Sequence, residues 1–125
     1  MLNTATQKKI LISAYAISPY LGSEYGVGWN FVTRLSAFYD ITVLYGTSGD
    51  RMGNNAELLD HIKKNGSAGI HYVHVRPNFL VLFFDWLNRE VNPIFFAYAF
   101  SFWQRQVLSA ARELVKKDNY DLVHH

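Results

Sequence analysis

The stretch Tyr15–Asn30, YAISPYLGSEYGVGWN, decides the fold because it joins an apolar run to a helical pattern through a glycine-rich segment. The run Lys9–Ala16 (KILISAYA) is short and apolar, which predicts a buried strand. The segment Val27–Phe38 repeats apolar residues at helical spacing, at positions 27, 31, 32, 35 and 38, which predicts a helix with one apolar face. A strand, a glycine-rich loop and a helix in that order direct backbone N–H groups at an anion.

The rest of the chain continues to alternate between the two kinds of element. The predicted elements are strand Asp40–Tyr45, helix Ala56–Lys64, strand Ile70–Val75, a helical middle of Pro77–Asn92, a long helix from Pro93 and strand Asp121–His125. This order predicts an α/β fold, a Rossmann-like, doubly wound parallel sheet with flanking helices and right-handed crossovers. Because the chain stops inside its fourth strand, we expect residues 1–125 to be an incomplete domain.

Composition excludes several classes of function. The 125 residues include twelve basic and ten acidic side chains in a mixed distribution, so nucleic acid is not an expected partner. Cysteine is absent, which excludes disulfides and cysteine-bound zinc. The N-terminus lacks the apolar core of a signal peptide, and no apolar run approaches the roughly 18 residues of a membrane span. We therefore expect a cytoplasmic protein, with peripheral membrane contact left open, and no bound metal.

The glycine-rich segment matches neither of two nucleotide-binding motifs, the P-loop and the dinucleotide fingerprint. No glycine there is followed by lysine, as a P-loop requires. Gly26 and Gly28 have the spacing of a dinucleotide fingerprint, but Phe31 stands where the third glycine belongs. A nicotinamide cofactor is therefore not expected. Spacing alone leaves two interpretations, a ligand-binding loop or a flexible turn whose glycines allow tight packing.

The segment AYAISPYLGSEYGVGWNFVTRLS (residues 14–36) resembles the first βα unit of glycosyltransferase family 4, whose members have the two-domain GT-B fold. The similarity continues through ITVLYGTSG (residues 41–49) to YDLVHH (residues 120–125). The resemblance implies that this chain is the first half of a GT-B N-terminal domain, and that the C-terminal donor-binding domain is absent from it.

That resemblance implies a hexosyltransferase-like activity in carbohydrate biosynthesis. Such enzymes transfer a sugar from a nucleotide-diphosphate donor to an acceptor, usually with retention, and their N-terminal domain mostly binds the acceptor. The donor would be a substrate, so no cofactor is expected, and the partners would be a nucleotide sugar and a carbohydrate or lipid-linked acceptor. The isolated chain is expected to be inactive. The alternative is a non-catalytic Rossmann-like module that binds a phosphorylated or sugar ligand.

The resemblance also suggests site residues in the glycine-rich segment and at the end of the chain. Backbone N–H groups of two glycines would face the diphosphate or the acceptor, where they would stabilise developing negative charge. Glu24 is expected either to accept a hydrogen bond from an acceptor hydroxyl or only to favour the helix dipole. The substrate-binding candidates are Gly22, Ser23, Glu24, Gly26 and Gly28.

His124 and His125 are the catalytic candidates, since similar enzymes contact the transferred sugar with a histidine after this strand. Adjacent strand residues point to opposite faces, so we expect only one of the two to reach the cleft. The family commonly shows His-x-His here, whereas this chain has His-His, and which histidine acts stays open. A plain structural role is the alternative for either one.

The segment from Phe79 to Trp103 holds ten of the aromatic residues, more than one helix face can bury. One interpretation is a core that also contacts the remainder of a larger protein. The other is an interfacial patch near a membrane, suited to a lipid-linked acceptor. Sparse basic residues favour the first interpretation.

Overall fold

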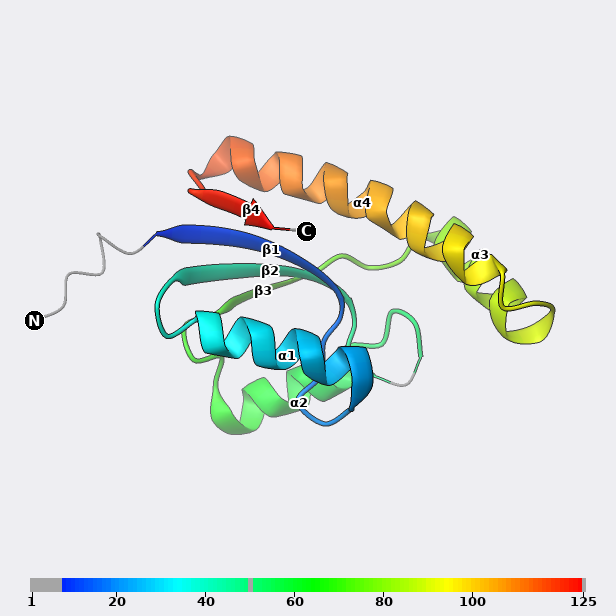
Figure 1. The fold of residues 1–125 in the computed structure, drawn as a ribbon, viewed down its shortest axis with the longest axis horizontal. Helices are drawn as coiled ribbons and strands as arrows, with labels where there is room; N and C mark the ends of the chain where they lie inside the picture. Colours follow the sequence, from blue (N-terminus) through cyan, green and yellow to red (C-terminus); the bar gives the residue numbers. More distant parts are fainter. Residues whose placement is uncertain (1–7, 50, 125) are drawn as a thin grey trace, which may run out of the picture.

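The computed structural model describes residues 8–49 and 51–124 as one α/β arrangement of four strands and four helices (Figure 1). In chain order the elements are β1 (Lys9–Ala16), α1 (Ser23–Leu35), β2 (Asp40–Thr47), α2 (Ala56–Asn65), β3 (His71–His74), α3 (Phe79–Glu90), α4 (Phe95–Lys117) and β4 (Leu122–His124).

The four strands form one parallel sheet in the order β3-β2-β1-β4. The chain moves outward from β1 to β2 and β3, and then crosses back to place β4 on the other side of β1. This confirms the predicted α/β fold, and the sheet is consistent with a Rossmann-like arrangement. The strand order therefore reverses between β1 and β4, and open α/β sheets bind ligands at the carboxyl ends of the strands at such a point.

Helices α1 and α2 cover one face of the sheet, below the strands in Figure 1. Alternate residues of β1 and β2, among them Ile10, Ile12 and Val43, are buried against them. Helix α1 contributes Val32, which is fully buried, and α2 contributes Leu58. Trp29 packs edge-on against His61 of α2, with the ring centroids 4.8 Å apart. This layer fixes α1 over the carboxyl half of β1.

Helix α4 covers the opposite face and is anchored there by Trp103. Its indole is fully buried, and Nε1–H donates to the Val75 carbonyl at 3.0 Å. The indole lies so close to Gly46 that a Cβ built on this glycine would come within 2.6 Å of the Trp103 ring nitrogen. Tyr15 packs edge-on against the same ring, at 4.9 Å between centroids. One side chain thus joins α4 to β1, β2 and the end of β3.

Helix α3 and the first half of α4 form a hairpin that extends past the carboxyl ends of the strands (Figure 1). Phe84 stacks on Phe102 at 5.3 Å and on Tyr98 at 5.4 Å, which holds the two helices together. Asn78 caps α3 by accepting the Val81 N–H at 3.1 Å. Within the described ranges, no helix has the length and apolar character needed to cross a membrane.

The main correction concerns α1, which begins at Ser23 and not at the predicted Val27. The predicted apolar face is also only partly buried, because Val32 and Leu35 reach the core while Val27, Phe31 and Phe38 are exposed. The N-terminal part of the glycine-rich segment is therefore the loop, and its later glycines belong to the helix. Packing against β1 outweighs the low helix propensity of glycine, about 1 kcal/mol per residue relative to alanine.

We expect Trp103→Phe to lower the free energy of unfolding by about 1–3 kcal/mol, because the Val75 carbonyl would lose its buried donor. Chemical denaturation measures this change. Tyr98→Phe is the matched control, since it removes a polar group from the same helix at a side chain that is half exposed. Equal stability of the two variants would contradict the anchoring role of Trp103.

Burial raises the pKa of Tyr72 to about 12, and it also raises the pKa of Tyr45. The unfolded-state pKa of tyrosine is about 10, so the neutral folded form is favoured in the interval between the two values. We expect this contribution to stability to be complete below about pH 10 and to be lost as the pH rises towards 12. Thermal unfolding across that interval should show a weaker pH dependence in Tyr72→Phe than in the wild type.

Candidate functional site

The loop between β1 and α1, residues 17–22, is held by the side chain of Ser18. Its Oγ accepts the N–H groups of Tyr20 at 3.0 Å and Leu21 at 3.3 Å, and donates to Glu57 Oε2 at 3.1 Å. Tyr20 donates its hydroxyl to Asp60 Oδ2 at 3.1 Å, which ties the loop to α2 a second time. The loop is therefore shaped by its own hydrogen bonds.

Gly22 is the N-cap residue of α1 and, in the described part of the chain, no side chain caps this end of the helix. A Cβ on Gly22 would meet nothing within 4 Å, so the position is open. Ser23 and Glu24 follow in the first turn, but their side chains lie outside what the structure describes. The expected roles of these side chains stay predictions.

The sequence predicted that Gly26 and Gly28 present free backbone N–H groups to a ligand. The structure contradicts this prediction, because both residues lie inside α1. The Gly26 N–H donates to the Gly22 carbonyl at 3.4 Å, and Gly28 lies more than one turn into the helix. Gly28 has a different function in the fold. A Cβ there would lie 2.7 Å from the Ala16 carbonyl oxygen, so this glycine lets α1 contact the end of β1.

The structure brings Gly28 and His124 to the same cavity, which we call the α1-side cavity. It has a volume of about 300 Å³ and lies between α1 and the carboxyl ends of β1 and β4. Phe31 forms part of its wall, with its ring 5.4 Å from that of His124. Apart from Ser13, the remaining lining residues are apolar: Ile12, Ala14, Val27 and Val32. The cavity occupies the point where the strand order reverses.

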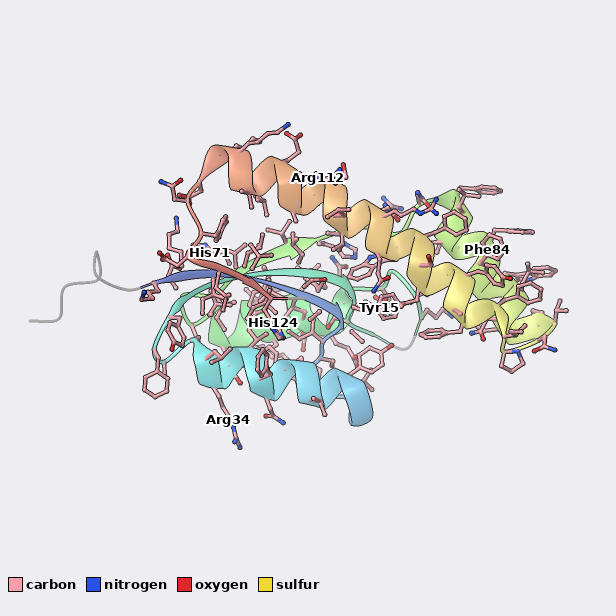
Figure 2. The ribbon with its side chains drawn as sticks, turned by 45° about the horizontal axis from the view of Figure 1, so that its top comes forward. Tyr15, Arg34, His71, Phe84, Arg112 and His124 are labelled. Carbon is pink, nitrogen blue, oxygen red and sulfur yellow. The ribbon has the colours of Figure 1, made fainter. Side chains whose placement is uncertain are left out.

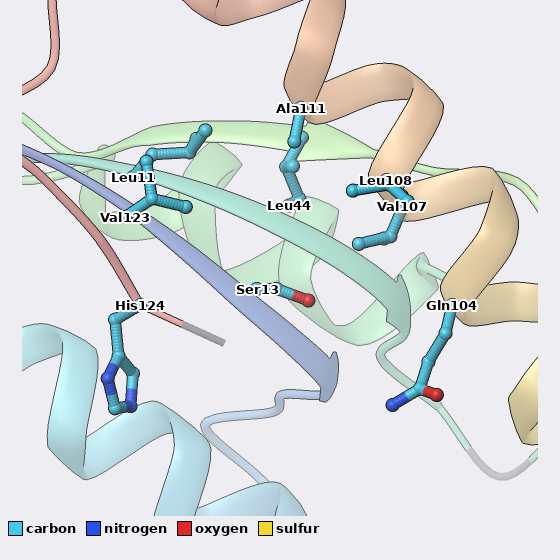
Figure 3. A pocket seen from close by; sticks show the side chains of 9 residues that line it. All are labelled: Leu11, Ser13, Leu44, Gln104, Val107, Leu108, Ala111, Val123 and His124. Carbon is cyan, nitrogen blue, oxygen red and sulfur yellow. The ribbon is translucent and has the colours of Figure 1, made fainter.

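A second cavity, the α4-side cavity, lies across the sheet between β1, β4 and α4 (Figure 3). It has a volume of about 250 Å³ and also includes His124 in its lining. Ser13 Oγ is buried at this cavity and has no hydrogen-bond partner among the described residues. In Figure 3 the ring of His124 points towards α1, away from the apolar side chains under α4. His125 lies outside the described residues.

The other histidines are used within the fold. His74 Nε2 lies 3.0 Å from the Gly46 carbonyl oxygen, and its ring stacks on Tyr45 at 5.0 Å. His71 Nε2 lies 3.6 Å from Asp40 Oδ1 at the opposite end of β3. Among residues 8–49 and 51–124, no three potential metal-binding side chains come together.

A third hollow, which we call the carboxyl-edge cleft, was not predicted. It has a volume of about 380 Å³ and lies between the ends of β1 and β2, the first turn of α1 and helix α3. Arg89 Nε donates to Asp85 Oδ2 at 3.1 Å, and the Asp85 side chain is mostly buried. Its polar lining residues are Tyr15, Tyr25, Thr47, Arg51, Asp85, Asn88 and Arg89. Thr47 is the last residue of β2, a position that a strand pattern indicates in the sequence, whereas nothing in the sequence places α3 beside it.

The chain matches no protein-family model, and comparison with curated proteins and with solved structures finds no match. The resemblance to glycosyltransferase family 4 therefore stays a prediction that depends on the residues quoted above.

We expect Gly28→Ala to lower the free energy of unfolding by roughly 1–2 kcal/mol. The new methyl group would push α1 away from the Ala16 carbonyl, an overpacking cost that exceeds the gain in helix propensity. Gly22→Ala is the control, because its Cβ would meet open space at an ordinary φ of −87°. Thermal unfolding followed by circular dichroism measures both. A Gly28→Ala variant as stable as the wild type would show that the close approach is not required.

Proposed function

We propose that this chain is the acceptor-side part of a retaining, GT-B-type glycosyltransferase that uses a nucleotide-diphosphate sugar. The observation that carries the proposal is the meeting of Gly28 and His124 at the point where the strand order reverses. Ligands of open α/β sheets bind at this point. The resemblance of the quoted segments to family 4 supplies the reaction class.

In this proposal His124 contacts the transferred sugar. An imidazole can both donate and accept hydrogen bonds, so it can orient a sugar hydroxyl without a metal ion. The Phe31 ring beside it offers an apolar surface for the face of a sugar ring. Donor binding is assigned to a second domain that is not part of this chain, and for this reason we expect the 125 residues to lack activity on their own.

The first test is sugar transfer by the protein translated from the whole reading frame, including any residues after His125. We expect His124→Ala to lower kcat/KM by roughly twofold to tenfold, the cost of one lost neutral hydrogen bond of about 0.5–1.5 kcal/mol. The measurement is release of nucleoside diphosphate from uridine and guanosine diphosphate sugars with a panel of acceptors. His71→Ala is the control, because His71 lies at the far end of β3. Unchanged transfer by His124→Ala would contradict the proposed role.

The second candidate is a non-catalytic module that binds a sugar or a phosphorylated ligand. One observation favours it: His124 is the only ionisable residue among the described side chains that line the α1-side cavity. A cavity with one ionisable group and apolar walls can bind a ligand. It offers no second ionisable side chain that would act with His124 as a general acid or base. Calorimetric binding of a sugar with no transfer by the whole translated protein would support this candidate over the enzyme.

A further inference from the structure

We propose that the carboxyl-edge cleft binds an amphiphile, a phosphate or phosphodiester head group joined to an apolar chain. The inference deepens the proposed function by naming the class of acceptor, and it rests on that function only for the ligand's role as an acceptor. The cleft and the α1-side cavity share no lining residue, and a further hollow that includes Tyr15, Gly28 and Phe96 in its lining lies between them.

The head-group end of the cleft carries an excess of positive charge. Two arginines, Arg51 and Arg89, and one carboxylate, Asp85, line the cleft, and Asp85 is paired with Arg89. Arg51 is exposed and forms no ion pair within the part of the chain that the structure describes. Tyr25 lies in the first turn of α1, so the positive end of that helix dipole borders the cleft as well. An unpaired arginine beside a helix N-terminus suits a phosphate group.

The other wall of the cleft is apolar and continues onto the exposed hairpin. Leu82 and Phe96 line the cleft, and yet they are 45% and 40% exposed. Beyond them, α3 exposes Phe83 and Trp86 to solvent. A ligand with its head group at Arg51 would therefore find exposed apolar side chains further along the hairpin. Figure 2 shows ring-bearing side chains gathered around Phe84 on this hairpin.

Few charges interrupt the apolar surface of the hairpin, so it suits an apolar chain, while the positive charge for the phosphate group comes from Arg51 of the cleft and not from the hairpin. From residue 79 to residue 104 the charged residues are Asp85, Arg89 and Glu90, and the first two neutralise each other. Tryptophan and tyrosine, here Trp86 and Tyr98, are the residues enriched where proteins meet the boundary between lipid and water. A cationic cleft joined to an aromatic surface is complementary to a head group joined to a tail.

The experiment uses the 125-residue chain and two soluble probes, dihexanoylphosphatidic acid in monomeric form and glycerol 3-phosphate. Binding is measured by NMR titration of backbone amides. We expect shifts at residues of the cleft, and an affinity for the amphiphile roughly tenfold or more above that for glycerol 3-phosphate, because the amphiphile also buries part of its acyl chains. Equal affinities would overturn the proposal, since they would leave only a site for free phosphate.

Matched variants locate the site. Arg51→Gln should weaken binding of the amphiphile roughly fivefold, while Arg112→Gln, the same change on the far half of α4, should not. Leu82→Asn should weaken it too, whereas Leu59→Asn, at a similarly exposed leucine on α2, should not. Thermal unfolding of each variant checks that it is folded. Equal losses in a cleft variant and its control would show non-specific attraction and would overturn the proposal.

A vesicle arm separates the cleft from general attraction to a charged surface. We expect the chain to sediment with phosphatidylcholine vesicles that contain phosphatidic acid, and Arg51→Gln to reduce the bound fraction. Binding to such vesicles without binding of the monomeric amphiphile would overturn the proposal. Amphiphile binding by the chain with no sugar transfer by the whole translated protein would leave this inference standing and remove the proposed function. Sugar transfer to soluble acceptors without amphiphile binding would support the proposed function and would overturn this inference.

Discussion

The insertion of Trp103 between the sheet and α4 is the contact on which the rest of the arrangement depends. The chain must cross from one edge of the sheet to the other side of β1, and α4 is the element that makes this crossing. Because the indole hydrogen-bonds to Val75 and lies against Gly46, the helix has one favourable position on the sheet. That position determines where β4 returns and in which direction the α3–α4 hairpin extends.

Both hollows at the carboxyl edge follow from this crossing. β4 pairs with β1 and brings His124 beside α1, so the α1-side cavity exists only because the chain returns on that side. The hairpin places Asp85 and Arg89 over the ends of β1 and β2, which forms the second wall of the carboxyl-edge cleft. One edge of the sheet thus offers a mostly apolar cavity with a histidine and a polar cleft with arginines.

Much of the fold could be predicted from the sequence, because its strands are short apolar runs with clear ends. The run at Lys9–Ala16 matches β1 in both bounds, and Gly66 ends α2 with a φ of 79°, as its place after Lys64 indicates. The start of α1 could not be predicted, since glycines at 26 and 28 indicate a loop until β1 is known to pack against them. The conformation of a glycine depends on its neighbours in space, which local spacing does not reveal.

The candidate site was also predicted only in part: two residues of the α1-side cavity were predicted, and the residues of the carboxyl-edge cleft were not. Gly28 and His124 were predicted from the resemblance to glycosyltransferase family 4, and the structure places both at the α1-side cavity, with Gly28 inside α1 and not in a loop. The arginines of the cleft were not predicted, because Arg51 and Arg89 lie 38 positions apart in chain order, and only the angle of the hairpin unites them. The packing angle of the α3–α4 hairpin cannot be read from local sequence patterns, so the residues that it brings to the cleft could not be predicted.

The open edge of β4 has a consequence for what can lie beside the sheet. β4 is the last strand in the order β3-β2-β1-β4, and the side chains of Leu122 and Val123 are both more than half exposed. An edge strand presents a row of unpaired backbone N–H and C=O groups, which makes it a template for a further strand. The sheet can therefore be extended in the direction away from β1, by pairing of a fifth strand with β4.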